Sequence, residues 1–260
     1  CFMGSIRASL LIAIFIMGVV GVVIVPYIGI LGIILAFFFL PGTAWYMAGM
    51  EGMHPILIFT VVTLVCWLAK MMMDRSMSIV YPRELFILII MLLMMICSTI
   101  GAAYSPKISW EWNTEFFRLI LIFFIFVNLI TSFNRLNIVF WIIVLCCGYM
   151  AIQGCRSYVL EGYSRLEHIG EGQFADSNEL ACMLATTIPF LFYKCFSKKK
   201  WEKILSNCLI FPTGFAVIIA SSRAASLQIV FTVILILLRK KLSPKLLILL
   251  VLFLGTILLF

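Results

Sequence analysis

The chain has 260 residues, of which 64% are hydrophobic and 12% charged, with a formal net charge of +8 and a mean hydropathy of +1.19. An ordinary soluble domain carries roughly 25% charged residues, so this composition excludes a soluble globular protein. The net charge gives no support for nucleic-acid binding, because the basic residues gather in short breaks between apolar runs, as expected beside an anionic membrane surface.

Apolar runs of membrane-spanning length recur along the whole chain. A helix needs about 20 residues to cross a hydrocarbon core of roughly 30 Å. We therefore predict an all-α fold, a polytopic transmembrane helical bundle forming a single membrane domain over residues 1–260. About ten spans are expected, at residues 6–25, 27–41, 55–73, 85–103, 117–133, 137–155, 179–196, 204–221, 224–238 and 244–260. The chain begins with Cys1 and stops inside an apolar run, so we expect a fragment that lacks its C-terminal part.

The outer break "YSPKISWEWNTEFFR" precedes the fifth predicted span. Its Trp110 and Trp112 are explained as interfacial anchors, while a platform for stacking sugars is the alternative. The predicted spans carry no Asp, Glu, Lys or Arg near a midpoint, where ion-coupled transporters usually place ionisable groups. This pattern disfavours a transporter.

The distribution of Lys and Arg predicts which side each break faces, because short cytoplasmic loops carry the excess. Two breaks, "KCFSKKKWEK" at 194–203 and "RKKLSPK" at 239–245, are lysine-rich and are predicted to be cytoplasmic. With ten spans, the opposite face receives the polar break at 156–178 and the corner "ASSRAASL" at 220–227. Arg165, Asp176 and Arg223 could therefore converge on the outer face.

The polar break before the seventh predicted span has two readings. In "ADSNEL", Asp176 and Glu179 have the spacing of a capping box, which satisfies free amides at a helix start. A cap needs only one or two polar residues, and the break also holds Glu167, His168, Glu171, Gln173 and Asn178. A ligand-contacting role for this surplus stays open beside the structural one. Further along, Pro189 is either a tolerated transmembrane proline or a kink compensated by Thr186 and Thr187.

Arg223 lies where an outgoing span meets a returning one. A snorkelling interfacial arginine is one interpretation. The other is anion binding, since a guanidinium beside the hydroxyls of Ser221 and Ser222 and a helix N-terminus suits phosphate oxygens. Metal chemistry is not expected: none of the nine cysteines form a Cys-x-x-Cys pair, and His54 and His168 lie far apart. The cysteines are predicted to be packed thiols, and we expect no cofactor.

The stretches "GQFADSNELACMLATTIPFLFY" and "IIASSRAASLQIVFTVILILL" resemble the O-antigen ligase and O-antigen polymerase family of bacterial polytopic glycosyltransferases. The family pattern is an arginine, a Gly-x-Phe, an Asp- or Asn-rich element that opens a helix, and a later Ser-Arg-x-x-x-Leu. It falls here on Arg165, on Gly172 with Phe174, on Asp176 with Asn178, and on Ser222, Arg223 and Leu227. The stretch "SWEWNTEFFRLILIFFIFVNLI" is also similar to members associated with exopolysaccharide and exosortase loci.

The resemblance implies a membrane enzyme that moves a glycan from an undecaprenyl-diphosphate carrier to an acceptor: lipid A core of lipopolysaccharide, protein or growing polysaccharide. It implies the periplasmic face of a bacterial inner membrane, with membrane lipids as further partners. Arg223 and then Arg165 would be the catalytic cations, and Asp176, Asn178 and Ser222 would contact substrate. The family's expected histidine base belongs to an external loop downstream of the matched residues, so His168 is not assigned that role.

Several alternatives stay open. The Ser-Arg-x-x-x-Leu element resembles the ligase branch more than the polymerase branch, but the residues do not separate the two. A lipid-linked glycan transporter would instead move substrate without forming a bond. A non-catalytic assembly subunit would tolerate substitution of both arginines.

Overall fold

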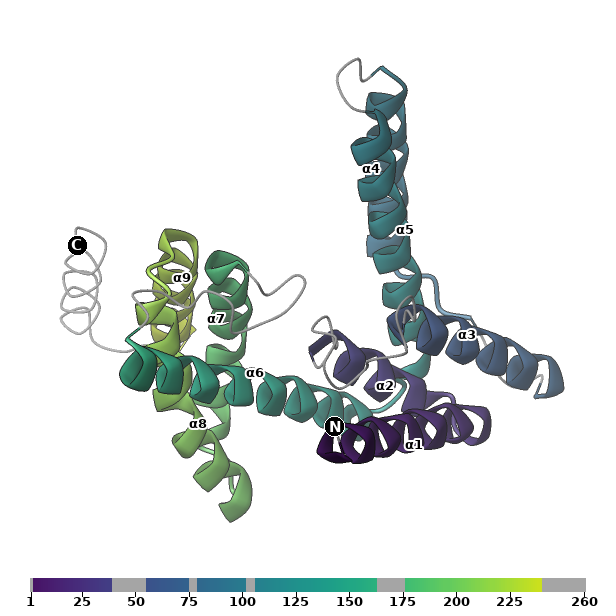
Figure 1. Cartoon of the computed structure of the whole chain (residues 1–260). Coiled ribbons are helices and arrows are strands. Elements are labelled where there is room, and N and C mark those ends of the chain that lie inside the picture. The colour runs from purple at the N-terminus through teal and green to yellow at the C-terminus, as the bar shows by residue number, and fades with distance from the viewer. Residues whose placement is uncertain (1, 39–54, 75–78, 102–105, 163–175, 240–260) are drawn as a thin grey trace. The chain divides into compact units, whose positions relative to one another are not determined.

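The structure, a computed structural model, describes residues 2–38, 55–74, 79–101, 106–162 and 176–239 (Figure 1). Within these ranges the chain is all helical and contains no strand, which confirms the predicted all-α class for this part of the chain. The helices are α1 Phe2–Ile24, α2 Tyr27–Phe38, α3 Pro55–Met73, α4 Arg83–Ile100, α5 Pro106–Leu129, α6 Phe133–Glu161, α7 Ser177–Lys194, α8 Lys200–Ile219 and α9 Arg223–Arg239.

The prediction of about ten membrane spans is not supported. Five helical segments in the described ranges are long and apolar enough to cross a membrane: Pro55–Met73, Arg83–Ile100, Lys107–Leu129, Phe133–Leu160 and Lys200–Ile219. The 12 residues of α2 reach only about 18 Å at 1.5 Å per residue. α7 has a polar first turn and a lysine at its end, which lower its mean hydropathy. The predicted span at 244–260 lies outside the described residues. The chain is therefore described as a membrane protein whose described residues include five candidate spans.

Two compact units divide the chain, one of residues 1–37 and 44–140 and one of residues 38–43 and 141–260. In the first unit, α1, α2 and α3 meet around Val22, Ile33 and Phe59, all nearly inaccessible. α2 and α3 approach closely through glycine: a Cβ on Gly32 would lie 2.6 Å from Phe59 Cε1. Any larger side chain there would displace that ring.

Two asparagines fix the register of the α4–α5 hairpin. The Asn113 side chain donates to Thr99 Oγ1 at 2.8 Å, near the C-terminal end of α4. At the other end, Asn128 Oδ1 accepts from the Val80 amide at 2.8 Å and its Nδ2 donates to the Val80 carbonyl at 3.2 Å. α4 is thus held against α5 by polar contacts at both ends, with apolar contact between them.

The prediction of uncharged span centres is wrong for α5, which begins at Pro106 rather than at residue 117. The helix therefore includes Glu115 and Arg118, which form an ion pair one turn apart. The midpoint of α5 falls between residues 117 and 118, so this pair lies near the centre of the helix. Each charge is compensated by the other.

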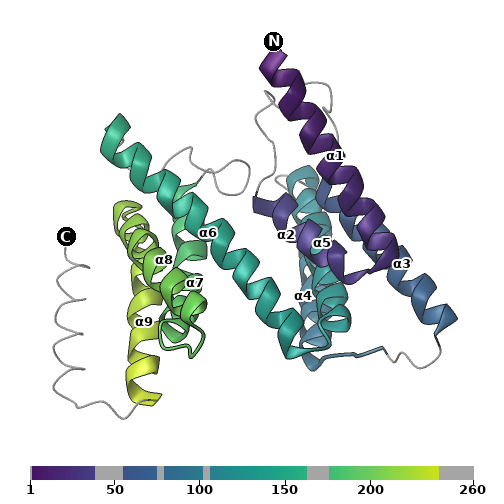
Figure 2. The same cartoon turned by 90° about the horizontal axis from the view of Figure 1, so that it is seen from below.

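In the second unit, α7 packs against both α8 and α9, and α6 lies across them from Trp141 onward (Figure 2). The core of this group consists of Trp141 and Val144 from α6, Leu191 from α7 and Leu209 from α8. Cys155 of α6 also lies 3.5 Å from the Pro212 carbonyl of α8. These contacts make α6 to α9 one packed group.

Pro189 does not interrupt α7, which runs unbroken from Ser177 to Lys194. A proline at 189 leaves the Ala185 carbonyl without its usual helical donor. The hydroxyls of Thr186 and Thr187 instead donate to the carbonyls of Met183 and Leu184, at 2.6 and 2.7 Å. Neither hydroxyl donates to the freed Ala185 carbonyl, so the predicted compensation is not observed.

Candidate functional site

The start of α7 and the start of α9 lie at the same end of the second unit. Residues 195–199 connect α7 to α8, and residues 220–222 connect α8 to α9. Each connection is short, and the chain reverses its direction at each of them. α7 and α9 pack on each other and lie side by side in Figure 1. We call residues 176–179 with residues 220–223 the Arg223 end, and residues 193–203 the Lys194 end.

Asp176 is the N-cap of α7. Its backbone is extended, with φ −82° and ψ 124°, and its side chain accepts a hydrogen bond from the Asn178 amide at 2.8 Å. This satisfies one of the free amides at the helix start. In a complete capping box the Glu179 carboxylate would also accept a hydrogen bond from the Asp176 amide. The described residues do not show this second bond. The capping prediction is thus confirmed for Asp176 alone.

Ser222 is the N-cap of α9 and is buried. Ser221 turns the chain with a left-handed φ of 52°. The Ser222 hydroxyl, 1% exposed, then accepts from the Ala225 amide at 3.5 Å, and its carbonyl accepts from the Ser226 amide and hydroxyl at 3.0 Å. The structure therefore gives Ser222 a local role in starting α9.

Arg223, the first residue of α9, is exposed. Its side chain makes no ion pair and no hydrogen bond within the described part of the chain. The N-terminus of a helix carries a partial positive charge and free amides, which attract anions. An exposed guanidinium at this position can form two parallel hydrogen bonds to a phosphate. The start of α9 is thus suited to an anion, while the exposed carboxylates of Asp176 and Glu179 lie at the same end of the unit.

The structure brings some of the site residues predicted from the sequence to the same end of the second unit. Asp176 and Asn178 at the start of α7 share the end of the unit that carries Ser222 and Arg223. Arg165 lies outside the described residues, as do both histidines, His54 and His168. Chemically, the described part of this end offers one cation for a phosphate, and two carboxylates and an amide for polar groups such as sugar hydroxyls.

Sequence reasoning missed a buried charge cluster at the Lys194 end. Glu202 has a side chain only 3% exposed, and it accepts from Lys194 Nζ at 3.0 Å and Ser197 Oγ at 2.7 Å. Lys199 Nζ approaches the other carboxylate oxygen at 3.7 Å. The available signal was a single carboxylate in a lysine-rich break, although nothing in the spacing identifies Lys194 as its partner.

The cysteines in the described residues are all free thiols. Burial raises the pKa of the Cys195 thiol between α7 and α8, which disfavours the thiolate needed by a metal or a nucleophile. The described ranges also hold no group of three or more side chains suited to a metal ion. Comparison with known protein families, with curated proteins and with solved structures finds no match for this chain.

Proposed function

We propose that this protein is a membrane glycosyltransferase that moves a glycan from an undecaprenyl-diphosphate carrier to an acceptor on the periplasmic face, in the manner of an O-antigen ligase. The observation that carries the proposal is the exposed Arg223 guanidinium at the start of α9, on the same end of the unit as the Asp176-capped start of α7. The five candidate spans supply the membrane setting.

The reaction requires a cation where the diphosphate leaves. Negative charge builds on the diphosphate as the glycosyl bond breaks, and preorganised donors at that point stabilise the transition state. In this proposal Arg223 binds the diphosphate, with Arg165 as a second cation. In this proposal Asp176 and Asn178 also hold the start of α7 in place and contact the glycan. An acceptor hydroxyl takes the glycan and gives up a proton to a base, a role we do not assign to any described residue.

The proposed orientation follows from charge. The Lys194 end holds five lysines and is placed in the cytoplasm by the positive-inside rule, so α8 carries the chain out to Arg223. A donor flipped across the inner membrane would meet the Arg223 end there. The acceptor is a lipid A core, a protein or a growing polysaccharide.

Removal of the guanidinium tests the proposal. Arg223→Ala should abolish glycan transfer in membranes while the protein level stays unchanged, and Arg223→Lys should also transfer poorly if the bidentate geometry is used. Arg83→Ala is a matched control, because Arg83 is likewise an exposed first residue of a helix, α4. Full transfer by Arg223→Ala would overturn the assignment. Carrier movement across the membrane without a new glycosidic bond would instead indicate a transporter.

A further inference from the structure

We propose that the Lys194 end is a binding surface for anionic phospholipid headgroups. Five lysines and a single carboxylate lie within residues 194–203: Lys194, Lys198, Lys199, Lys200, Lys203 and Glu202. Lys198, Lys200 and Lys203 are exposed, and within the described residues they make no ion pair. The surface therefore presents uncompensated positive charge.

The shape of this surface is set by the buried Glu202. Its contacts to Lys194 and Ser197 tie the end of α7 to the start of α8, and Ser197 Oγ also accepts from the Lys199 amide at 3.3 Å. Lys194 Nζ lies 5.9 Å from the centre of the Trp141 ring, so the ion pair is also packed against α6. The exposed lysines thus extend from an ordered turn, and little backbone conformational entropy remains to be lost on binding.

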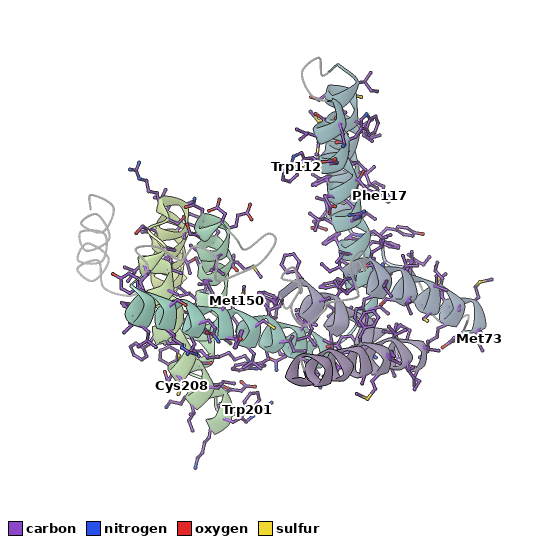
Figure 3. All side chains as sticks on the ribbon, in the orientation of Figure 1. Met73, Trp112, Phe117, Met150, Trp201 and Cys208 are labelled. Atoms are coloured by element: carbon purple, nitrogen blue, oxygen red, sulfur yellow. The ribbon has the colours of Figure 1, made fainter. Side chains whose placement is uncertain are left out.

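The aromatic residues of this end favour a membrane lipid over a soluble anion. Tyr193, Phe196 and Trp201 are 78%, 66% and 53% exposed, although large aromatic side chains are usually mostly buried in folded proteins. Figure 3 shows Trp201 projecting from the first turn of α8. Its ring centre lies 5.1 Å from that of Trp141. Aromatic rings settle at the headgroup level of a bilayer. α8 is a candidate span that begins at Lys200, so lysines and rings meet at the depth of the lipid phosphates.

The test is photocrosslinking of the full chain in phosphatidylcholine nanodiscs that contain a photoreactive phosphatidylglycerol or a photoreactive phosphatidylcholine. We expect phosphatidylglycerol crosslinks to map to residues 193–203. Each lysine near an anionic surface contributes about fivefold in affinity, so Lys198→Gln/Lys200→Gln/Lys203→Gln should lower this affinity, and the crosslinking at low lipid fraction with it, by about a hundredfold. The corresponding triple arginine variant should retain it.

The matched control removes the same charge from the first unit. Lys70→Gln/Arg83→Gln/Lys107→Gln changes three exposed positions and should leave the crosslinks at 193–203 unchanged. An equal loss in this control would show that only net charge matters and would overturn the site. Equal labelling by phosphatidylcholine, or complete competition by millimolar inorganic phosphate, would overturn the assignment to an anionic lipid. These outcomes are independent of Arg223 and of glycan transfer.

Discussion

Glu202 and Glu115 carry the same carboxylate group, but one is buried and the other is half exposed. The Glu202 side chain is 3% exposed and receives donors from Lys194 and Ser197, whereas the Glu115 side chain is 50% exposed and pairs with Arg118 on the same helix. Breaking a buried pair leaves a charge without compensation, which costs far more than losing an exposed pair that water already screens. The two residues should therefore differ sharply in their contribution to stability.

We expect Glu202→Ala to lower the free energy of unfolding by at least about 2 kcal/mol, because Lys194 would remain partly buried without its carboxylate. Glu115→Ala should lower it by less than about 1 kcal/mol. Thermal or denaturant unfolding of the purified chain in detergent measures both. Equal effects of the two substitutions would contradict the burial of the Glu202 pair.

Single residues were predictable from sequence where their partners are local. The cap by Asp176 needs only an amide two residues away, and its sequence pattern is sufficient. The pairing of Lys194 with Glu202 depends on the fold of the turn between them, and the burial of Ser222 depends on how α9 packs. Neither has a signature in the spacing of residues.

At the scale of helices, the apolar runs in the sequence predicted where the helices lie along the chain better than where each helix begins and ends. The predicted run at 55–73 coincides with α3 Pro55–Met73. α5 instead begins at Pro106, about three turns before the predicted residue 117, because the polar stretch "KISWEWNTE" is helical and Asn113 anchors it to α4. A hydropathy pattern locates the membrane-compatible part of a helix and misses its polar continuation.

Within the described residues, fewer segments than predicted qualify as membrane spans, because apolar character alone was taken as evidence of crossing. α2 is strongly apolar, but its 12 residues are too few, and Val22 and Ile33 show that α1 and α2 share a buried core with α3. Burial inside the protein and exposure to lipid select the same residue types. Length and packing separate the two, and packing is not visible in a sequence.

For α8 we expect a full crossing of the membrane. In a background without cysteine, Lys198→Cys and Ala224→Cys place one exposed thiol before and one after the candidate span Lys200–Ile219. An impermeant maleimide should label Ala224→Cys in intact cells and Lys198→Cys only after permeabilisation, because the lysine-rich end is the cytoplasmic one. Labelling of both thiols in intact cells would contradict a crossing by α8.

At the scale of the molecule, the second unit has two chemically different ends. The Lys194 end is rich in lysine and exposed aromatic rings around a buried carboxylate. The Arg223 end carries one exposed guanidinium and a capped helix start. In the two proposals, the first end binds anionic lipid at the cytoplasmic surface, and the second binds the diphosphate of the glycan donor on the other side.

The most direct test of this assignment is the affinity of the purified chain for undecaprenyl diphosphate, measured for the wild type, Arg223→Ala and the control Arg83→Ala. A hydrogen-bonded charge pair contributes about 1.5–3 kcal/mol, so Arg223→Ala should weaken binding by about tenfold to a hundredfold. Arg83→Ala should bind as the wild type does. Unchanged affinity in Arg223→Ala, or an equal loss in Arg83→Ala, would contradict a diphosphate site at the start of α9.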